Sequence, residues 1–259
     1  MDSSLQRMLK AIDADKAKLD ALRPLSPPAL ASLRERLRQE WTPDATAIEH
    51  STLALREIQV VLDNMTMGGR PLPQHCEIMG RRGAMRYLEE IVATNERVSV
   101  WQIRNLHNVV LKGGVGEEAC RYRHVNVAIA GARTTPPDFL DLPAELTALV
   151  EWHARVANMH PVARAAELHT RFVRIHPFVD GNGRTGRLIL NVELMKSGYP
   201  PAVIGNQDRA AYCDSLDDAC VNENYAGITR LIAESVRRSF DIYLGALGLR
   251  VDHRPCDAP

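Results

Sequence analysis

The twelve residues 176–187 concentrate side chains that can do chemistry. They read His-Pro-Phe-Val-Asp-Gly-Asn-Gly-Arg-Thr-Gly-Arg, and the residues after them, 188–197, have the spacing of a helix. Gly181-Asn182-Gly183 therefore lies where a loop enters a helix N-terminus, and free backbone N–H groups at such an end bind anions. Arg184 and Arg187 are three positions apart, so they share a face of that helix. The pattern predicts a phosphate site with a base beside it.

Each charged or basic side chain of the segment has a role in such a site. His176 has an ordinary pKa near ~6.5, which suits a general base at neutral pH. Asp180 can hold Mg²⁺ between phosphate oxygens, and the guanidinium groups of Arg184 and Arg187 can neutralise the outer phosphates. A lone histidine before a turn is usually structural, and so is a Gly-Asn-Gly loop. The joint pattern is what carries the prediction.

The elements around this segment are mostly helical. Pro161 opens the helix that leads to the motif, and Pro177 prevents that helix from continuing. Prolines and glycines separate the other periodic segments. Apolar residues recur at helical spacing within residues 5–22, 30–41, 55–62, 87–92, 103–110, 142–153, 165–175, 188–197, 212–216 and 225–236.

One segment has a different period. Val125, Val127 and Ile129 alternate with small or polar residues, which is the only clear strand signal in the chain. Gly131 follows, and Pro136-Pro137 ends the unit. We therefore expect one short β-hairpin, too small to form a domain sheet, on a mostly α-helical single domain.

Composition excludes several classes of function. Of the 259 residues, 45% are hydrophobic and 25% charged, which is typical of a globular protein. Lysine plus arginine and aspartate plus glutamate both total 32, so no global charge favours nucleic acid or an anionic membrane. Five scattered cysteines without a CxxC pair argue against disulfides or zinc and fit a reducing cytoplasm. No signal region and no membrane span are expected.

The motif resembles the signature of the Fic family, His-x-Phe-x-(Asp/Glu)-Gly-Asn-Gly-Arg-x-x-Arg, and every specified position is met. The similarity covers about residues 45–245. It implies an all-α, Fic-type helical bundle with one short β-hairpin flap. On this basis we expect an N-terminal helical segment packed on the core (1–44), a Fic domain with an inhibitory helix (45–250), and a flexible tail (251–259).

The resemblance also implies an activity, the transfer of AMP from ATP to a serine, threonine or tyrosine hydroxyl of a protein. His176 would deprotonate that hydroxyl, and Asp180 would coordinate Mg²⁺ between the α- and β-phosphates. Gly181, Asn182 and Gly183 would form the anion hole, with Arg184 and Arg187 on the β- and γ-phosphates. Phe178 would anchor the loop in the core. The Doc branch of the family has lysine at position 183 and transfers phosphate; glycine here favours nucleotidyl transfer.

Two further segments resemble Fic features. Residues 45–50, Ala-Thr-Ala-Ile-Glu-His, are similar to the inhibitory helix (Ser/Thr)-x-x-x-Glu-(Gly/Asn), although Ala45 and His50 depart from that pattern. Glu49 would pair with Arg187 and block productive seating of ATP. The hairpin with Val125, Val127 and Ile129 resembles the flap that holds an extended target segment by strand addition.

Three residues are candidates for the base and ribose side of the nucleotide. Asn191 lies seven positions beyond Arg184 on the same helical face, and Tyr212 and Tyr225 resemble residues of the adenine pocket in relatives. Aromatic residues at helical spacing belong to the core more often than to a ligand wall.

The leading hypothesis is an autoinhibited protein adenylyltransferase that uses ATP and Mg²⁺. Its partners would be ATP and a protein target, with no membrane and no nucleic acid, and a homodimer is left open. Alternatives are a de-AMPylase, a transferase of another nucleotide, and an interaction protein that kept the pocket without turnover. The intact His176 and Asp180 speak against the last. A nucleic-acid-binding regulator with a winged-helix module is disfavoured by the short tail after Val251 and the neutral charge.

Overall fold

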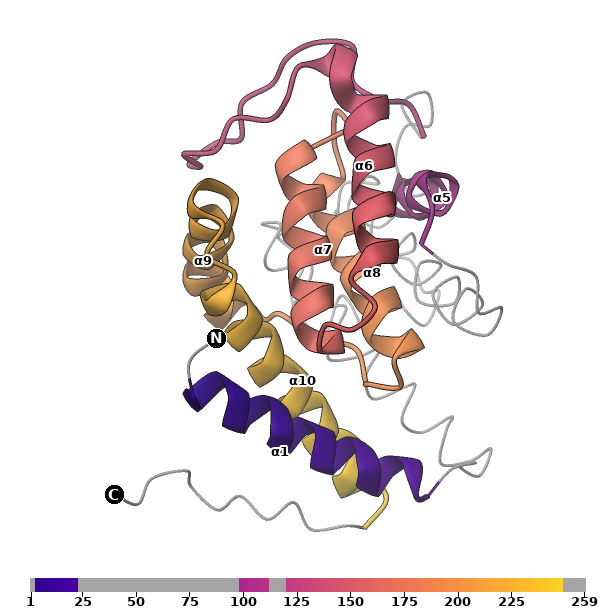
Figure 1. Ribbon diagram of the computed structural model, residues 1–259, viewed down its shortest axis with the longest axis vertical. Helices are drawn as coiled ribbons and strands as arrows, with labels where there is room; N and C mark the ends of the chain where they lie inside the picture. The colour runs from indigo at the N-terminus through magenta and orange to yellow at the C-terminus, as the bar shows by residue number, and fades with distance from the viewer. Residues whose placement is uncertain (1–2, 23–97, 112–119, 249–259) are drawn as a thin grey trace, which may run out of the picture.

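Two antiparallel helices that flank the motif form the centre of the molecule. The computed structural model describes residues 3–22, 98–111 and 120–248. Within them, α7 (Pro161–Ile175) and α8 (Asn182–Lys196) make the most extensive helix–helix contact. The helix α5 (Val100–Leu111) packs on α8, and α6 (Leu142–Arg155) packs on α7 (Figure 1). The motif is therefore held between helices that are far apart in sequence.

The remaining helices close the other end of the α7–α8 pair. The long α10 (Ala226–Ala246) contacts α7, α9 (Arg209–Asn222) and α1 (Ser3–Asp20), as Figure 1 shows for α1 and α10. Short 3₁₀ turns at Phe139–Asp141 and Asn206–Asp208 lead into α6 and α9. The first described helix thus packs against the last one.

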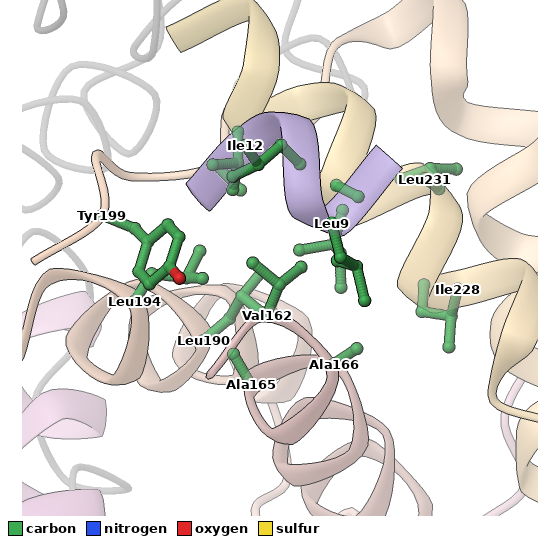
Figure 2. Close-up of a cluster of buried hydrophobic side chains, with 14 of the residues drawn as sticks. Leu9, Ile12, Val162, Ala165, Ala166, Leu190, Leu194, Tyr199, Ile228 and Leu231 are labelled. Atoms are coloured by element: carbon green, nitrogen blue, oxygen red, sulfur yellow. The ribbon is translucent and has the colours of Figure 1, made fainter. Parts of the chain in front are cut away.

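Two hydrophobic cores meet on α7 and α8. One core joins α1, α9 and α10 to the N-terminal part of α7 and the C-terminal part of α8; Figure 2 shows Leu9 and Ile12 of α1 beside Val162 and Leu194. The other joins α5 and α6 to the opposite ends of the same two helices and contains Phe178 of the motif. Every residue from Thr185 to Leu194 is buried, so α8 is a central helix covered on all sides.

A charged cluster ties three helices together. Glu193 of α8 is 3% exposed and accepts hydrogen bonds from His153 Nε2 at 2.8 Å and from Arg164 Nε at 2.6 Å. Burial alone would raise the pKa of Glu193, but the bonds from His153 and the charge of Arg164 outweigh burial and lower it. The cluster links α6, α7 and α8 on the side of the core away from the motif.

The expected β-hairpin is not formed, since no strand is assigned to the described residues. Residues 121–138 leave the body as two neighbouring extended arms that reach toward α9 (Figure 1). Within residues 121–138 the arms share one internal backbone hydrogen bond, the turn from the Ala132 N–H to the Ile129 carbonyl. Side chains hold the arms instead: Asn126 bonds Asp138 and the Phe139 N–H at the base, and Asp217 of α9 binds Arg133 at the tip. The alternating residues predicted extended backbone, which the arms have. They also predicted strand pairing, which residues 121–138 do not form.

The helical predictions that fall on described residues are confirmed, with one shift. The motif helix begins at Asn182 rather than at residue 188, so both motif arginines lie within it. The segments predicted at 30–41, 55–62 and 87–92, the segment 45–50 and the tail lie outside the described residues. Among the described helices, none combines the length and apolarity that a bilayer crossing requires.

Candidate active site

The α7–α8 connection holds His176 in a defined backbone conformation. His176 ends α7 in the left-handed region (φ 49°, ψ 57°), and its N–H donates to the Phe172 carbonyl at 3.1 Å. Left-handed backbone is uncommon for a residue with a side chain, and Pro177 stops the helix directly after it. The turn thus places the imidazole at the rim of the loop that follows.

Phe178 and Asn182 hold the loop in place from the side of the core. Phe178 is fully buried, as expected, and its ring stacks on His107 of α5 with the centroids 3.6 Å apart. The Asn182 amide donates to the Phe178 carbonyl at 2.8 Å and accepts from the Phe178 N–H at 3.0 Å. The Asn182 side chain therefore braces the loop, which leaves the backbone of Asn182 as the part that could face an anion.

Gly181 is required by its conformation and by its neighbour. It caps the N-terminus of α8 with φ at 77°, and a Cβ built there would lie 3.3 Å from Cδ2 of His107. The first intrahelical bond of this end runs from the Thr185 N–H to the Gly181 carbonyl. N–H groups of a first helical turn have no intrahelical acceptor, so this turn offers donors to an anion.

The motif residues surround one open pocket of about 400 Å³. Its walls are formed by His176, Val179, Asp180, Gly181, Asn182, Gly183, Arg184 and Arg187. The Asp180 carboxylate accepts from Arg184 at 2.8 Å and from the Gly181 N–H at 2.6 Å. The Arg187 residue is 7% exposed and lies deeper than Arg184. The structure thus brings all seven predicted residues of the phosphate and catalytic site together.

The surroundings of His176 favour the neutral imidazole. Burial lowers the pKa of His176 below its ordinary value, and the positive charge of Arg123 lowers it further. The Val173 carbonyl and the Asp180 carboxylate act in the opposite direction without reversing the shift. A neutral imidazole can accept a proton at physiological pH, as a general base must.

Arg123 holds the backbone of this histidine. It is 2% exposed, its Nε donates to the His176 carbonyl at 2.9 Å, and its backbone N–H donates to the Pro177 carbonyl at 2.9 Å. The two terminal nitrogens of its guanidinium group donate to the carbonyls of Val125 and Pro137 at the base of the two arms. One buried side chain therefore joins the segment 121–138 to the residue that carries the base.

His107 plays a similar part on the other side of the loop. Its Nδ1 accepts from the Cys120 N–H at 3.1 Å, so in the neutral ring Nε2 carries the proton and donates to the Asp180 carbonyl at 3.0 Å. Burial lowers the pKa of His107, which stabilises this neutral form. His107 lies within the predicted helical segment 103–110, and no sequence signal linked it to a carbonyl 73 positions away.

The three candidates for the nucleotide base side are not walls of this pocket. Asn191 is fully buried, and its amide exchanges two hydrogen bonds with the backbone of Ala202, at 2.7 and 3.1 Å. Tyr212 is 5% exposed, and its hydroxyl pairs with His169 at 2.7 Å. Tyr225 is partly exposed and lies near Arg171, away from the motif.

Of the two other predicted elements, the flap lies within the described residues and the inhibitory segment does not. Val125 is half exposed on the first arm, and Val127 and Ile129 are partly exposed on the same arm. Glu49 lies outside the described residues, so its predicted contact with Arg187 stays a prediction.

Known proteins are similar to this chain in sequence and in fold. Residues 97–194 match the model of the Fic/DOC family. A protein adenylyltransferase Fic of Drosophila willistoni is 32% identical over 245 residues, which are 93% of this chain and 48% of the relative. The corresponding protein of Nematostella vectensis is 32% identical over 248 residues, 93% of this chain and 56% of the relative. The chain thus spans about half the length of the curated relatives it matches.

Solved structures extend the similarity to the fold. Fic-1 of C. elegans (residues 134–508) superposes with a TM-score of 0.84 at 28% identity, covering 95% of this chain and 73% of that one. A Fic domain containing signaling protein from Bacteroides thetaiotaomicron gives 0.81 at 25% identity, covering 93% of this chain and all of that one. The match in sequence and fold shows that this chain contains a Fic domain, with residues 97–194 fitting the model of the Fic/DOC family.

Proposed function

We propose that this protein transfers AMP from ATP to a hydroxyl group of a protein target. The observation that carries the proposal is the pocket itself. One wall offers a neutral imidazole, and the others offer a carboxylate, the first turn of α8 and two guanidinium groups. The curated relatives that match most of this chain are named protein adenylyltransferases.

In the proposed reaction His176 accepts the proton of the target hydroxyl. The hydroxyl oxygen attacks the α-phosphorus of ATP, the bond from that phosphorus to the bridging β-phosphate oxygen breaks, and pyrophosphate leaves. The first-turn N–H groups of α8 and the guanidinium groups of Arg184 and Arg187 bind the phosphates. Such catalysis consists mainly of positioning and charge stabilisation.

The residues present fit a magnesium ion that is shared with the nucleotide. Mg²⁺ usually takes one or two protein carboxylates and fills the remaining positions with phosphate and water. Asp180 provides one carboxylate, 75% exposed, at the edge of the pocket. Bound there with ATP, the ion would neutralise phosphate charge. Arg184 pairs with the same carboxylate and would be released toward the phosphates.

The target is proposed to lie along the arms 121–138. Val125, Val127 and Ile129 expose apolar surface there, and within residues 121–138 the two arms are not paired with each other as strands, which leaves backbone groups for strand addition. Because Arg123 joins the base of the arms to His176, a segment held on them would have a fixed distance to the base.

Burial limits which of the three candidate residues can contact the base or the ribose of the nucleotide. Asn191 is proposed to act through the packing of α8, and Tyr212 through the contact of α9 with His169 of α7, since both use their polar groups in internal hydrogen bonds. Tyr225 lies near Arg171, away from the motif, so no direct contact with adenine is proposed for any of the three. The activity is proposed for the cytoplasm, because Cys120, Cys213 and Cys220 are free thiols.

Regulation by Glu49 is part of the proposal. A carboxylate paired with Arg187 would take the position of an ATP phosphate, so the resting enzyme would be inhibited. We expect Glu49→Gly to raise auto-modification by labelled ATP above that of the parent protein. Glu57→Gly, a change of the same chemistry on a neighbouring stretch, is the control. Equal labelling of the parent and Glu49→Gly, both folded, would refute the switch.

The transfer itself is tested with two labels. The parent, Glu49→Gly and Glu49→Gly/His176→Ala proteins are incubated with lysate and with ATP labelled at the α- or the γ-phosphate. The proposal predicts protein-bound label from the α-phosphate only, and its loss without His176. Label from the γ-phosphate would make the protein a kinase, and label independent of His176 would remove the assigned base.

A further inference from the structure

A second hollow lies between α6, α7 and the base of the arms. It has a volume of about 340 Å³, and its walls include Pro137 of the arms, Trp152 and Arg155 of α6, and Arg171 and Arg174 of α7. Glu145 is the one acidic residue among its walls. We call it the arginine groove. Three guanidinium groups against one carboxylate give it a net positive charge, although the whole chain is neutral.

The groove contains one fixed and two available guanidinium groups. Arg171 stacks on the Trp152 ring, 4.4 Å from its centroid, and its Nε and a terminal nitrogen donate to Glu167 at 2.9 and 2.7 Å. Arg155 and Arg174 are exposed, and neither forms a hydrogen bond or an ion pair with another described residue. An aromatic floor with a stacked arginine and two uncommitted arginines is suited to carboxylates.

The dimensions of the groove suit a peptide. Glu145 and Arg155 are ten residues apart on α6, which corresponds to about 15 Å at ~1.5 Å per helical residue. An extended chain covers ~3.3 Å per residue, so four or five residues would span this distance. The groove is therefore long enough for a short segment and too small for a folded domain.

The groove is linked to the site through Arg123 and through the chain itself. Its wall residue Pro137 accepts a hydrogen bond from Arg123, and Arg123 also donates to the His176 carbonyl. Arg174 and Ile175, also on the wall, directly precede His176 in the chain.

We propose that the arginine groove docks an acidic segment of the protein target, next to the segment presented to His176. The inference rests on the proposed function for the identity of the partner. Carboxylates four or five residues apart would reach Arg174 and Arg155 and bind each through paired N–H groups. The groove would then select targets by acidic residues at some distance from the modified hydroxyl. The arms would add little selectivity, because strand addition depends mainly on backbone hydrogen bonds.

A nucleic acid is the less favoured occupant. Asp217 binds Arg133 at the tip of the arms, and Asp214 and Asp218 act on the same arginine, so the neighbouring end of α9 is acidic and would repel a long polyanion. The groove also has a single aromatic ring, whereas single-strand binding stacks successive bases on several.

Binding is measured without any transfer reaction, by fluorescence anisotropy of labelled peptides on His176→Ala protein. The probes are a Glu/Asp-rich heptapeptide and the same sequence with Gln and Asn. The double variant Arg155→Glu/Arg174→Glu is compared with Arg7→Glu/Arg237→Glu, which changes net charge equally at exposed positions of α1 and α10. Arg155→Lys/Arg174→Lys keeps the positive charge and removes the planar guanidinium group, which can bind a carboxylate through two N–H groups.

The proposal predicts that the acidic peptide binds the parent more tightly than its amide counterpart. Reversal of the two groove arginines should weaken it about five- to tenfold, the size expected for two exposed ion pairs. The affinity for the acidic peptide should fall less in the lysine variant. In the control variant that affinity should differ little from the affinity of the parent. Salt should weaken binding to the parent and barely affect the reversed variant.

Three results would overturn the proposal: equal affinity for the acidic and amide peptides, equal losses in the groove and control variants, or tighter groove-dependent binding of a single-stranded oligonucleotide of the same charge. The test separates this inference from the proposed function. Groove-dependent peptide binding by a protein that transfers no AMP would contradict the activity and leave the docking surface in place.

Discussion

At the scale of single residues, the site depends on side chains that support the motif from outside it. His176, Asp180, Arg184 and Arg187 are close in sequence, so their joint role could be predicted from order and spacing alone. The contacts that hold them come from His107 and Arg123, at sequence separations of 73 and 53. Such pairings arise only when α5 and the base of the arms pack on the loop, and no local pattern encodes them.

The pH dependence of transfer follows from the surroundings of His176. Its folded pKa is lowered, chiefly by burial, so the neutral base persists at a pH below the ordinary histidine value of ~6.5. We expect the acidic limb of kcat/KM to fall at a pH lower than that. The rate is measured across pH on a folded protein, with the unfolding transition followed over the same range. An acidic limb above ~6.5 would contradict the assigned environment.

Arg123 is predicted to position the base. Arg123→Lys retains a positive charge but loses the fork that bonds three carbonyls, so His176 and the arms should lose their mutual alignment. We expect kcat to fall by roughly tenfold to a hundredfold, because small displacements are costly at a reacting centre, while KM for ATP changes little.

The neighbouring Arg121 provides the control for this prediction. It is exposed, and Arg121→Lys should leave both kinetic constants near those of the parent. A merely structural role for Arg123 would lower the amount of folded protein and leave kcat per active site unchanged. That result, obtained by active-site titration, would remove Arg123 from the account.

At the scale of elements, helices could be predicted well and the arms only in part. Periodic burial is a local property, so each described helix was visible in the spacing of apolar residues such as Leu5, Leu9 and Ile12. The alternation of Val125, Val127 and Ile129 indicated extended backbone, but pairing depends on partners elsewhere. Here Asn126 and Asp217 hold the arms through side chains, and no ladder forms.

The three-helix charge cluster should dominate stability over any exposed ion pair. Glu193→Ala leaves Arg164 without its carboxylate partner in a buried position and should lower the free energy of unfolding by about 3–5 kcal/mol. Asp20→Ala removes the partner of Lys16 in a part-buried i,i+4 pair of α1 and should cost no more than about 1 kcal/mol. Chemical denaturation of both variants measures the difference, and similar losses would show that the cluster is not a structural tie.

Acid should destabilise the fold through a histidine that the reaction does not use. His169 is fully buried beside Tyr212, and burial lowers its pKa to about 4. The unfolded chain binds this proton near ~6.5, so stability is complete above that value and is lost as the pH falls toward 4, by about 3 kcal/mol. His169→Gln should flatten the dependence of unfolding free energy on pH in this window. An unchanged slope would mean that other groups carry the acid response.

At the scale of the whole molecule, the helical bundle places two surfaces next to the end of α7, the motif pocket and the arginine groove. Arg123 connects both to the base of the arms. Sequence order predicted the first surface because its residues form one contiguous motif. The groove combines α6, α7 and the arms, whose arrangement appears only in the folded chain.

The central claim is that His176 catalyses AMP transfer to a protein hydroxyl. Mass spectrometry of the product tests it most directly, with Glu49→Gly protein, ATP and Mg²⁺ as the reaction and Glu49→Gly/His176→Ala as the control. We expect a modified serine, threonine or tyrosine heavier by one adenosine monophosphate group, and no such peptide without His176. A mass gain of a single phosphate, or an AMP adduct that persists in the His176→Ala protein, would contradict it.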